Sequence, residues 1–359
     1  MDDQFPDYVG VDYDAGFDES VDSYPTLESK VRRATDVTRT ALDRYRNPAL
    51  LWTGGKDSTL ALSIAVRIAD EDGVDPPTAV FLDHLQQFTE IRTFVECWAD
   101  EWGLDLVVAR NDSVASVVRD RGLKPGESVP IDDLTDRNKW HVRRILGFEE
   151  ETFPFLLGTT VADHLLTELP INDVLDEHDI DGLITGTRWD DGGIRGDDVT
   201  RDNGTTPDEE RTQGEERTSD EANGHGDERF FSPRHDSDRF PPHDRIHPLL
   251  PFTEQDVWGS FFTHVFPDVV DGYPVGHVPD SPEDLPDGIE PASVPVPSLY
   301  FDGFRSVGNE VPTSRPGDTP AWTQASHETT QDSQGTARRV GRGREDAELT
   351  EQLDQQGSL

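Results

Sequence analysis

The chain has 359 residues, and its 74 acidic and 32 basic side chains give a formal net charge of −42. A field of that sign repels the phosphates of nucleic acids and of anionic lipids, so we expect neither as a partner of the bulk surface. The acidic excess is spread along the whole sequence, which contains one Cys and one Met. This composition is typical of a halophilic protein from a haloarchaeal-type cytoplasm, where salt screens self-repulsion beyond a few ångströms.

The single cysteine, Cys97, excludes an internal disulfide framework and any zinc or iron–sulfur site built from several cysteines. The first residues have neither the basic nor the apolar region of a signal peptide. No window approaches the roughly 18 apolar residues needed to cross a membrane. We therefore expect a cytoplasmic protein with no membrane partner.

The order of predicted elements indicates an α/β fold. Strands are expected at 49–52, 78–83, 105–109 and 182–186, and helices at about 24–46, 60–68, 88–102 and within 133–176. The run Ala-Leu-Leu-Trp at 49–52 is short and continuously apolar, as in a strand buried on both faces. Alternation of this kind predicts a Rossmann-like, doubly wound and mainly parallel sheet with helices on both faces.

Three segments are expected to lie outside this fold. Residues 1–25 form a predicted acidic, disordered arm, 197–242 a disordered insertion, and 311–359 a disordered acidic tail. These segments are poor in aliphatic side chains and cannot bury enough apolar surface to fold. The predicted domain therefore spans 26–310 and contains the insertion.

The strongest local motif is Thr-Gly-Gly-Lys-Asp-Ser at 53–58, between the first predicted strand and a helix. Gly54 and Gly55 allow backbone conformations that turn successive N–H groups toward one point. Together with the positive end of the helix, these groups form an anion cradle. The spacing differs from that of a Walker A loop, which has four residues between its first glycine and Gly-Lys.

Side chains of the same loop suit a nucleotide phosphate. Thr53 and Ser58 supply hydroxyl groups, and Lys56 supplies a positive charge. Asp57 can cap the helix or help to hold a divalent cation that arrives with the phosphates. We therefore expect a pyrophosphate-binding loop.

This hexapeptide resembles the Ser-Gly-Gly-Lys-Asp-Ser loop of the adenine nucleotide α-hydrolase (PP-loop ATP pyrophosphatase) superfamily. More narrowly, the chain resembles the phosphoadenosine phosphosulfate (PAPS) reductase family. Four further stretches are similar to family motifs, in the same order: 80–84 with 88–90, 183–190 with Arg195, 247–249 with 252–258, and 299–308. The resemblance covers about 48–309, without the insertion.

The resemblance implies a nucleotide across the carboxyl ends of the strands, at the point where strand order reverses. It implies catalytic roles for Lys56, Arg188 and Arg195, because arginine makes planar, bidentate contacts with phosphate or sulfate. Gly186 is expected in the nucleotide site. Asp83 is expected to meet a ribose hydroxyl or a metal, with a turn cap as the alternative.

The sequence indicates other polar residues less strongly as part of the site. The densest cationic group of the predicted fold comprises Lys139, His141, Arg143 and Arg144. This group either helps to hold the anion or forms a solvated helix face. Asp256 and Trp258 are expected to begin and anchor a helix in the core.

Two departures from the family count against PAPS reduction. Asn309 follows Gly308 where many relatives have the cysteine that attacks sulfur, and Thr167 stands where relatives often carry Lys. Cys97 lies in a predicted helix near Phe94 and is expected to be a buried hydrophobe, not a nucleophile.

The favoured activity is transfer of the adenylyl group of ATP to an acceptor, with pyrophosphate leaving into the loop. This reaction needs positioning and charge neutralisation but no protein nucleophile. Mg²⁺ would bridge the phosphates, with Asp57 as its protein ligand. The family suggests an acceptor of sulfur metabolism.

There are two alternatives to this activity. The chain could be a PAPS or adenylyl-sulfate reductase that uses an external thiol, or a nucleotide-binding module without catalysis. A homodimer is left open.

Overall fold

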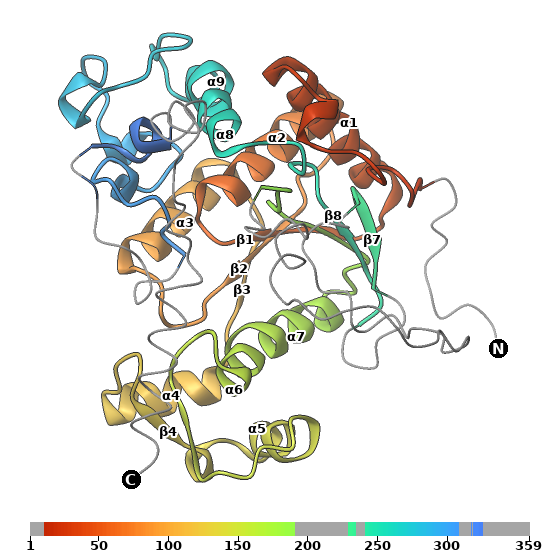
Figure 1. Cartoon of the computed structure of the whole chain (residues 1–359), viewed down its shortest axis with the longest axis vertical. Helices are drawn as coiled ribbons and strands as arrows, with labels where there is room; N and C mark the ends of the chain where they lie inside the picture. Colours follow the sequence, from red (N-terminus) through yellow and green to blue (C-terminus); the bar gives the residue numbers. More distant parts are fainter. Residues whose placement is uncertain (1–10, 191–228, 235–240, 309–316, 318, 326–359) are drawn as a thin grey trace, which may run out of the picture.

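The computed structural model describes residues 11–190, 229–234, 241–308, 317 and 319–325. Its main feature is a six-stranded sheet of order β3-β2-β1-β6-β8-β7 (Figure 1). The strands are β1 Pro48–Trp52, β2 Thr78–Leu82, β3 Leu106–Ala109, β6 Gly182–Ile184, β7 Phe231–Pro233 and β8 Asp244–Ile246. All neighbours are parallel except β7 and β8, so the predicted mainly parallel sheet is confirmed.

Helices cover both faces of this sheet, as predicted (Figure 1). The helices that pack on it are α1 Leu27–Arg44, α2 Lys56–Asp72, α3 Thr89–Glu101, α7 Leu169–Glu177 and α8 Glu254–Ser260. Side chains of β1 alternate, because successive residues of a strand point to opposite faces. Leu50 and Trp52 pack with α1, α2, α3 and α8, whereas Ala49 packs in a separate core with α7. No described helix is long and apolar enough to span a membrane.

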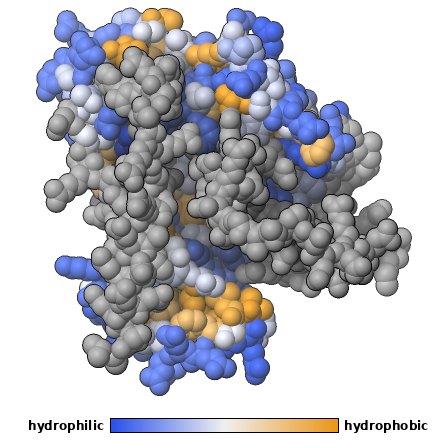
Figure 2. All heavy atoms as spheres, in the orientation of Figure 1, coloured by the Kyte–Doolittle hydropathy of each residue, from blue (hydrophilic) through white to orange (hydrophobic). Residues whose placement is uncertain are grey.

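A smaller lobe follows β3 and has its own apolar core. It contains α4 Asp112–Arg121, β4 Ser128–Pro130, α5 Asp136–Trp140, β5 Thr152–Pro154 and α6 Thr160–Asp163. The prediction of a helical stretch over 133–176 is wrong in part, because β5 interrupts it and pairs antiparallel with β4. Gly147 adopts positive φ between the His141–Ile145 turn and β5, and such residues end helices readily. On the face in Figure 2, hydrophilic residues cover most of the described surface, and a cluster of hydrophobic residues lies on this lower lobe.

Short helical turns complete the described elements. The 3₁₀ turns are Val21–Ser23, Ile131–Asp133, Pro282–Asp284, Pro291–Ser293 and Ser298–Tyr300; π turns lie at His141–Ile145, His164–Glu168 and Phe261–Val265, and α9 is Phe266–Val269.

Part of the predicted disordered insertion is folded, which corrects that prediction. Phe231–Pro233 forms β7 at the edge of the sheet, and Phe230 is fully buried. The Phe230 N–H donates to the carbonyl of Ala15, and its ring contacts those of Tyr24 and Trp189. Phe230 and Phe231 are both buried, and together they supply the apolar surface that this segment, with its few aliphatic side chains, otherwise lacks.

The predicted arm and tail are also ordered in part. Within residues 11–25, the Tyr13 hydroxyl donates to Asp244 at 2.8 Å, and the main chain of this segment contacts Phe230. Near the other end, Trp322 is buried against Trp258 and donates to the carbonyl of Pro279 at 2.8 Å. The remainder of the predicted arm, insertion and tail lies outside the described residues.

Two glycines allow the chain to close around the start of α2. Gly54 has φ of +75°, and a β-carbon there would lie 2.6 Å from the Ile91 side chain. A β-carbon on Gly186 would lie 2.6 Å from the backbone nitrogen of Ser58, so the loop after β6 can approach α2 only with glycine at that position. Gly55 has φ of −76°, a conformation open to any residue, so only the first glycine of the pair is conformationally required.

We predict that Phe230→Ala lowers the free energy of unfolding by about 3 kcal/mol, the usual cost of deleting a buried aromatic side chain. Urea denaturation measures this change, with the exposed Val275→Ala as the matched control. Equal stability of the two variants would mean that the β7 segment is not part of the folded core.

We also predict that Gly54→Ala destabilises the protein by about 1–2 kcal/mol because a β-carbon is strained at positive φ. Gly55→Ala should change the free energy of unfolding much less, since a β-carbon there meets Thr53 Oγ1 at an ordinary 3.4 Å. Thermal and urea unfolding of the two variants provide the comparison. An effect of the same size at both positions would contradict this account of the loop.

Candidate functional site

The candidate site lies where the order of strands reverses. β1 pairs with β2 on one side and with β6 on the other, and all three are parallel. The loops that follow β1 and β6 therefore leave the sheet at the same edge, next to the start of α2 at Lys56. This position is the one that the sequence predicts for a nucleotide.

Hydroxyl groups shape the 53–58 loop from inside. The Ser58 hydroxyl accepts from the Thr53 N–H at 3.2 Å, lies 3.0 Å from Thr53 Oγ1 and donates to the Gly55 carbonyl at 3.1 Å. The Gly55 N–H in turn contacts Thr53 Oγ1 at 3.4 Å. Thr53 and Ser58 thus stabilise the loop itself, and their expected contacts with a phosphate stay predictions.

Two buried cations converge on Asp57. Lys56 Nζ lies 3.3 Å from one carboxylate oxygen and Arg188 Nε lies 3.0 Å from the other. Lys56 and Arg188 are each only 7% exposed. Lys56 comes from α2 and Arg188 from the chain after β6, so the sheet brings together two cations that are far apart in sequence.

Further carboxylates and a third cation extend this arrangement into a charge cluster. The charge cluster consists of Lys56, Asp57, Arg188, Asp190, Glu254 and Arg305. Glu254 lies 3.7 Å from Lys56 Nζ and pairs with Arg305 at 2.5 Å, while Asp190 lies 3.3 Å from Arg188. Each buried cation therefore has a carboxylate neighbour, which offsets the cost of removing it from water.

The surroundings keep Lys56 charged. Burial lowers the pKa of its amine, but the negative charges of the Asp57 and Glu254 carboxylates help to outweigh burial and leave the pKa above its ordinary value. The side chain is consequently a permanent cation at physiological pH.

Sequence reasoning did not single out Tyr300, Glu254, Arg305 or Asp190. The Tyr300 hydroxyl accepts the Lys56 N–H at 2.9 Å, and its ring packs on Trp258. The sequence could have indicated these four residues as part of the site, because all of them fall in the stretches 183–190, 252–258 and 299–308 that carry the family resemblance.

Two residues have the structural role expected of them. Asp256 accepts from the Thr253 N–H at the start of α8 and pairs with Lys30 at 2.6 Å. Trp258 is buried in the main core. The interpretation of both as structural is confirmed.

Asp83 lies at the end of β2, as expected, but its carboxylate is already engaged. It lies 3.0 Å from Arg92 and 3.6 Å from Arg110, and it accepts from the Leu85 N–H at 3.2 Å. These contacts match the turn-cap alternative, and a contact with ribose or metal stays a prediction.

Two candidates remain, Arg195 and the cationic group at 139–144. Arg195 lies outside the described residues. The cationic group at 139–144 makes its described contacts within the small lobe: Arg143 donates to the carbonyls of Phe148 and Glu150, and His141 Nδ1 lies 3.1 Å from His164 Nε2. Nothing described joins this group to the 53–58 loop.

The expectation that Cys97 is buried is wrong. Cys97 is exposed on α3. The buried stripe of that helix runs through Ile91, Phe94, Val95 and Trp98. At 3.6 residues per turn, position 97 lies about 120° around the helix from Ile91 and so faces outward.

Asp57 is the predicted metal ligand, and its two carboxylate oxygens lie 3.3 Å from Lys56 Nζ and 3.0 Å from Arg188 Nε. The described residues contain no cluster of three or more His, Cys, Asp or Glu side chains with metal-binding geometry. Mg²⁺ is commonly held by one or two carboxylates together with substrate phosphates. A single carboxylate would hold Mg²⁺ only together with substrate phosphates, and this role of Asp57 stays a prediction.

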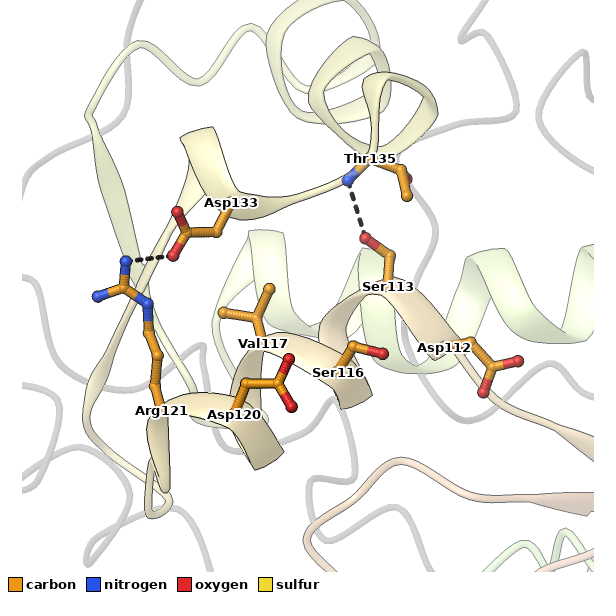
Figure 3. Close-up of a pocket in the computed structure, with 8 residues that line it drawn as sticks. All are labelled: Asp112, Ser113, Ser116, Val117, Asp120, Arg121, Asp133 and Thr135. Carbon is orange, nitrogen blue, oxygen red and sulfur yellow. Dashed lines mark hydrogen bonds and ion pairs between the residues drawn. The ribbon is translucent and has the colours of Figure 1, made fainter.

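A depression of about 540 Å³ elsewhere on the molecule is a poor phosphate site (Figure 3). It is lined by α4 and the segment before α5, with Asp112, Asp120 and Asp133 on its walls. Its one cation, Arg121, pairs with Asp133. An acidic lining repels phosphate, so this depression does not compete with the 53–58 loop.

Solved structures with a similar arrangement include PAPS reductase from Candida auris and FMN adenylyltransferase from Candida glabrata. The first has a TM-score of 0.43 and 13% identity, and the match covers 80% of this chain and 96% of that one. The second, a complex with FAD and pyrophosphate, has a TM-score of 0.42 and 14% identity over 92% and 88% of the two chains. These values are too low to support any inference about activity.

Curated relatives are found among bacterial sulfate adenylyltransferases, whereas no protein-family model matches the chain. Subunit 2 from Rhizobium meliloti is 24% identical over 169 residues, which cover 47% of this chain and 45% of the relative. Subunit 2 from Bradyrhizobium is 21% identical over 297 residues, covering 80% and 69%. The chain thus matches less than half the length of the first relative. The five ordered motifs and these two relatives indicate a similarity to the PAPS reductase-like group of the PP-loop superfamily.

Proposed function

We propose that this protein binds ATP with its phosphates over the 53–58 loop and transfers the adenylyl group to sulfate. A sulfate oxygen attacks the α-phosphorus, the bond from that phosphorus to the bridging oxygen breaks, and pyrophosphate leaves with the electron pair. The observation that carries the proposal is the convergence of Lys56 and Arg188 on one point at the start of α2. The choice of sulfate rests on the names of the two sulfate adenylyltransferase relatives.

Local charge is what makes a phosphate site possible in this chain. The net charge of −42 repels a nucleotide from the surface as a whole. Lys56 and Arg188 are buried at the end of α2 that carries the positive pole of the helix dipole. Fixed cations in a site sheltered from water stabilise charge that develops on a leaving group more strongly than mobile ones at the surface.

Mg²⁺ fits this reaction as the partner of Asp57. When bound, the ion neutralises phosphate charge and orients the leaving group. Asp57 would hold the ion from the protein side, while Lys56 and Arg188 remain within reach of the same phosphates. Arg195 is proposed as a further cation for the transferred phosphate.

Adenylyl transfer and the alternative reductase reaction differ in the product that they release. A reductase acting on PAPS or adenylyl sulfate releases no pyrophosphate and needs a thiol. The sequence has no cysteine other than Cys97, so such a reaction would require an external thiol. Both curated relatives are named as one subunit of an enzyme, so a second protein is proposed as a requirement for full turnover.

We predict that Lys56→Ala and Arg188→Ala each weaken ATP–Mg²⁺ binding by about 10- to 100-fold, the usual range for loss of a contact to a charged group. Isothermal titration calorimetry measures this without needing turnover. The controls are Lys124→Ala and Arg119→Ala, which remove exposed cations on the small lobe. Pyrophosphate release from ATP and sulfate is the second readout. Wild-type affinity in both site variants would refute the proposal.

Cys97→Ser should leave nucleotide affinity and pyrophosphate release unchanged, because the thiol faces outward from α3. The measurement is a parallel assay of pyrophosphate release and of thiol-dependent PAPS reduction by both proteins. Reduction of PAPS that disappears with this substitution would favour the reductase alternative instead.

A further inference from the structure

The Tyr300 hydroxyl lies at the first turn of α2. It accepts the Lys56 N–H at 2.9 Å, and a β-carbon on Gly55 would lie 3.6 Å from it. The side chain is only 1% exposed, and its ring meets Trp258 edge to face at 5.0 Å. The phenol therefore has one orientation, with its oxygen beside the 53–58 loop.

The segment that carries Tyr300 is attached at two further points. Arg305 pairs with Glu254 of the charge cluster, and the Gly308 carbonyl lies 2.7 Å from His84 Nε2, after β2. The rings of Phe304 and Phe88 also pack together, with centroids 5.2 Å apart. Residues 299–308 thus extend from the start of α2 to the end of β2, which fixes Tyr300 relative to the loop.

The Tyr300 hydroxyl is available as a hydrogen-bond donor. A phenol can accept and donate at once, and within the described residues its single hydrogen bond is the one that it accepts from Lys56. Burial, the largest influence, and the carboxylates of Asp57 and Glu254 raise the pKa of Tyr300 to about 12. The group is consequently protonated at physiological pH and remains a donor.

We propose that Tyr300 contacts the pyrophosphate part of the nucleotide directly, donating its hydroxyl proton to a phosphate oxygen while it accepts the Lys56 N–H. This inference rests on the proposed function, because it requires phosphates over the 53–58 loop. It gives residues 299–308 a role in specificity: the contact is available to ATP and to pyrophosphate, but not to AMP, whose only phosphate is the one that is transferred.

The test is Tyr300→Phe, which removes the hydroxyl and keeps the ring against Trp258. Calorimetric titrations use ATP, inorganic pyrophosphate and AMP, each with Mg²⁺. We expect affinity for ATP and for pyrophosphate to fall about tenfold, because hydrogen bonds to charged groups are among the stronger ones, and affinity for AMP to stay the same. The matched control is Tyr273→Phe, another buried tyrosine, whose hydroxyl donates to the His277 carbonyl at 2.9 Å.

The other outcomes separate this inference from the proposed function. Wild-type affinity of Tyr300→Phe for pyrophosphate would overturn the inference and leave the proposed function intact. An equal loss for AMP and pyrophosphate would also overturn it, because it would show that the hydroxyl only shapes the site. Failure of the wild-type protein to bind ATP or pyrophosphate would overturn the proposed function and this inference together.

Discussion

The pairing of Lys56 and Arg188 with Asp57 is the interaction on which the rest of the site depends. A buried cation is costly unless a carboxylate or hydrogen bonds compensate for the lost water. The cluster meets this requirement for Lys56 with Asp57 and Glu254, and for Arg188 with Asp57 and Asp190. In a strongly acidic chain, this arrangement keeps two buried cations beside the 53–58 loop, each balanced by neighbouring carboxylates.

The architecture of the sheet makes that pairing possible. β1 and β6 are adjacent, so the chain after β6 passes over the start of α2, where Gly186 allows a backbone approach that any β-carbon would block. Segments remote in sequence then enclose the site: α8 supplies Glu254, and residues 299–308 supply Tyr300 and Arg305. Segments that are remote in sequence also pack together at the β7 edge of the sheet, where Phe230 contacts residues of the N-terminal segment.

Much of the fold could be predicted because it is encoded locally. Short apolar runs gave four of the five parallel strands, and apolar periodicity gave α1, α2 and α3. The errors have a common cause. Residues 229–234 look too polar to fold, yet Phe230 and Phe231 are buried by partners that local composition does not reveal. Cys97 shares a helix with buried aromatics, but its angular position on that helix faces away from the core.

By itself, the sequence determined the 53–58 loop, its place between a strand and a helix, and the alternation that yields a parallel sheet. These features depend on neighbours within a few residues and on the periodicity of apolar side chains. Only the tertiary structure decided which carboxylates accompany Lys56 and Arg188, and that a tyrosine 244 positions along the chain holds the Lys56 N–H. Such contacts arise from strand order and from the packing of distant segments, and neither is written in the local pattern of residues.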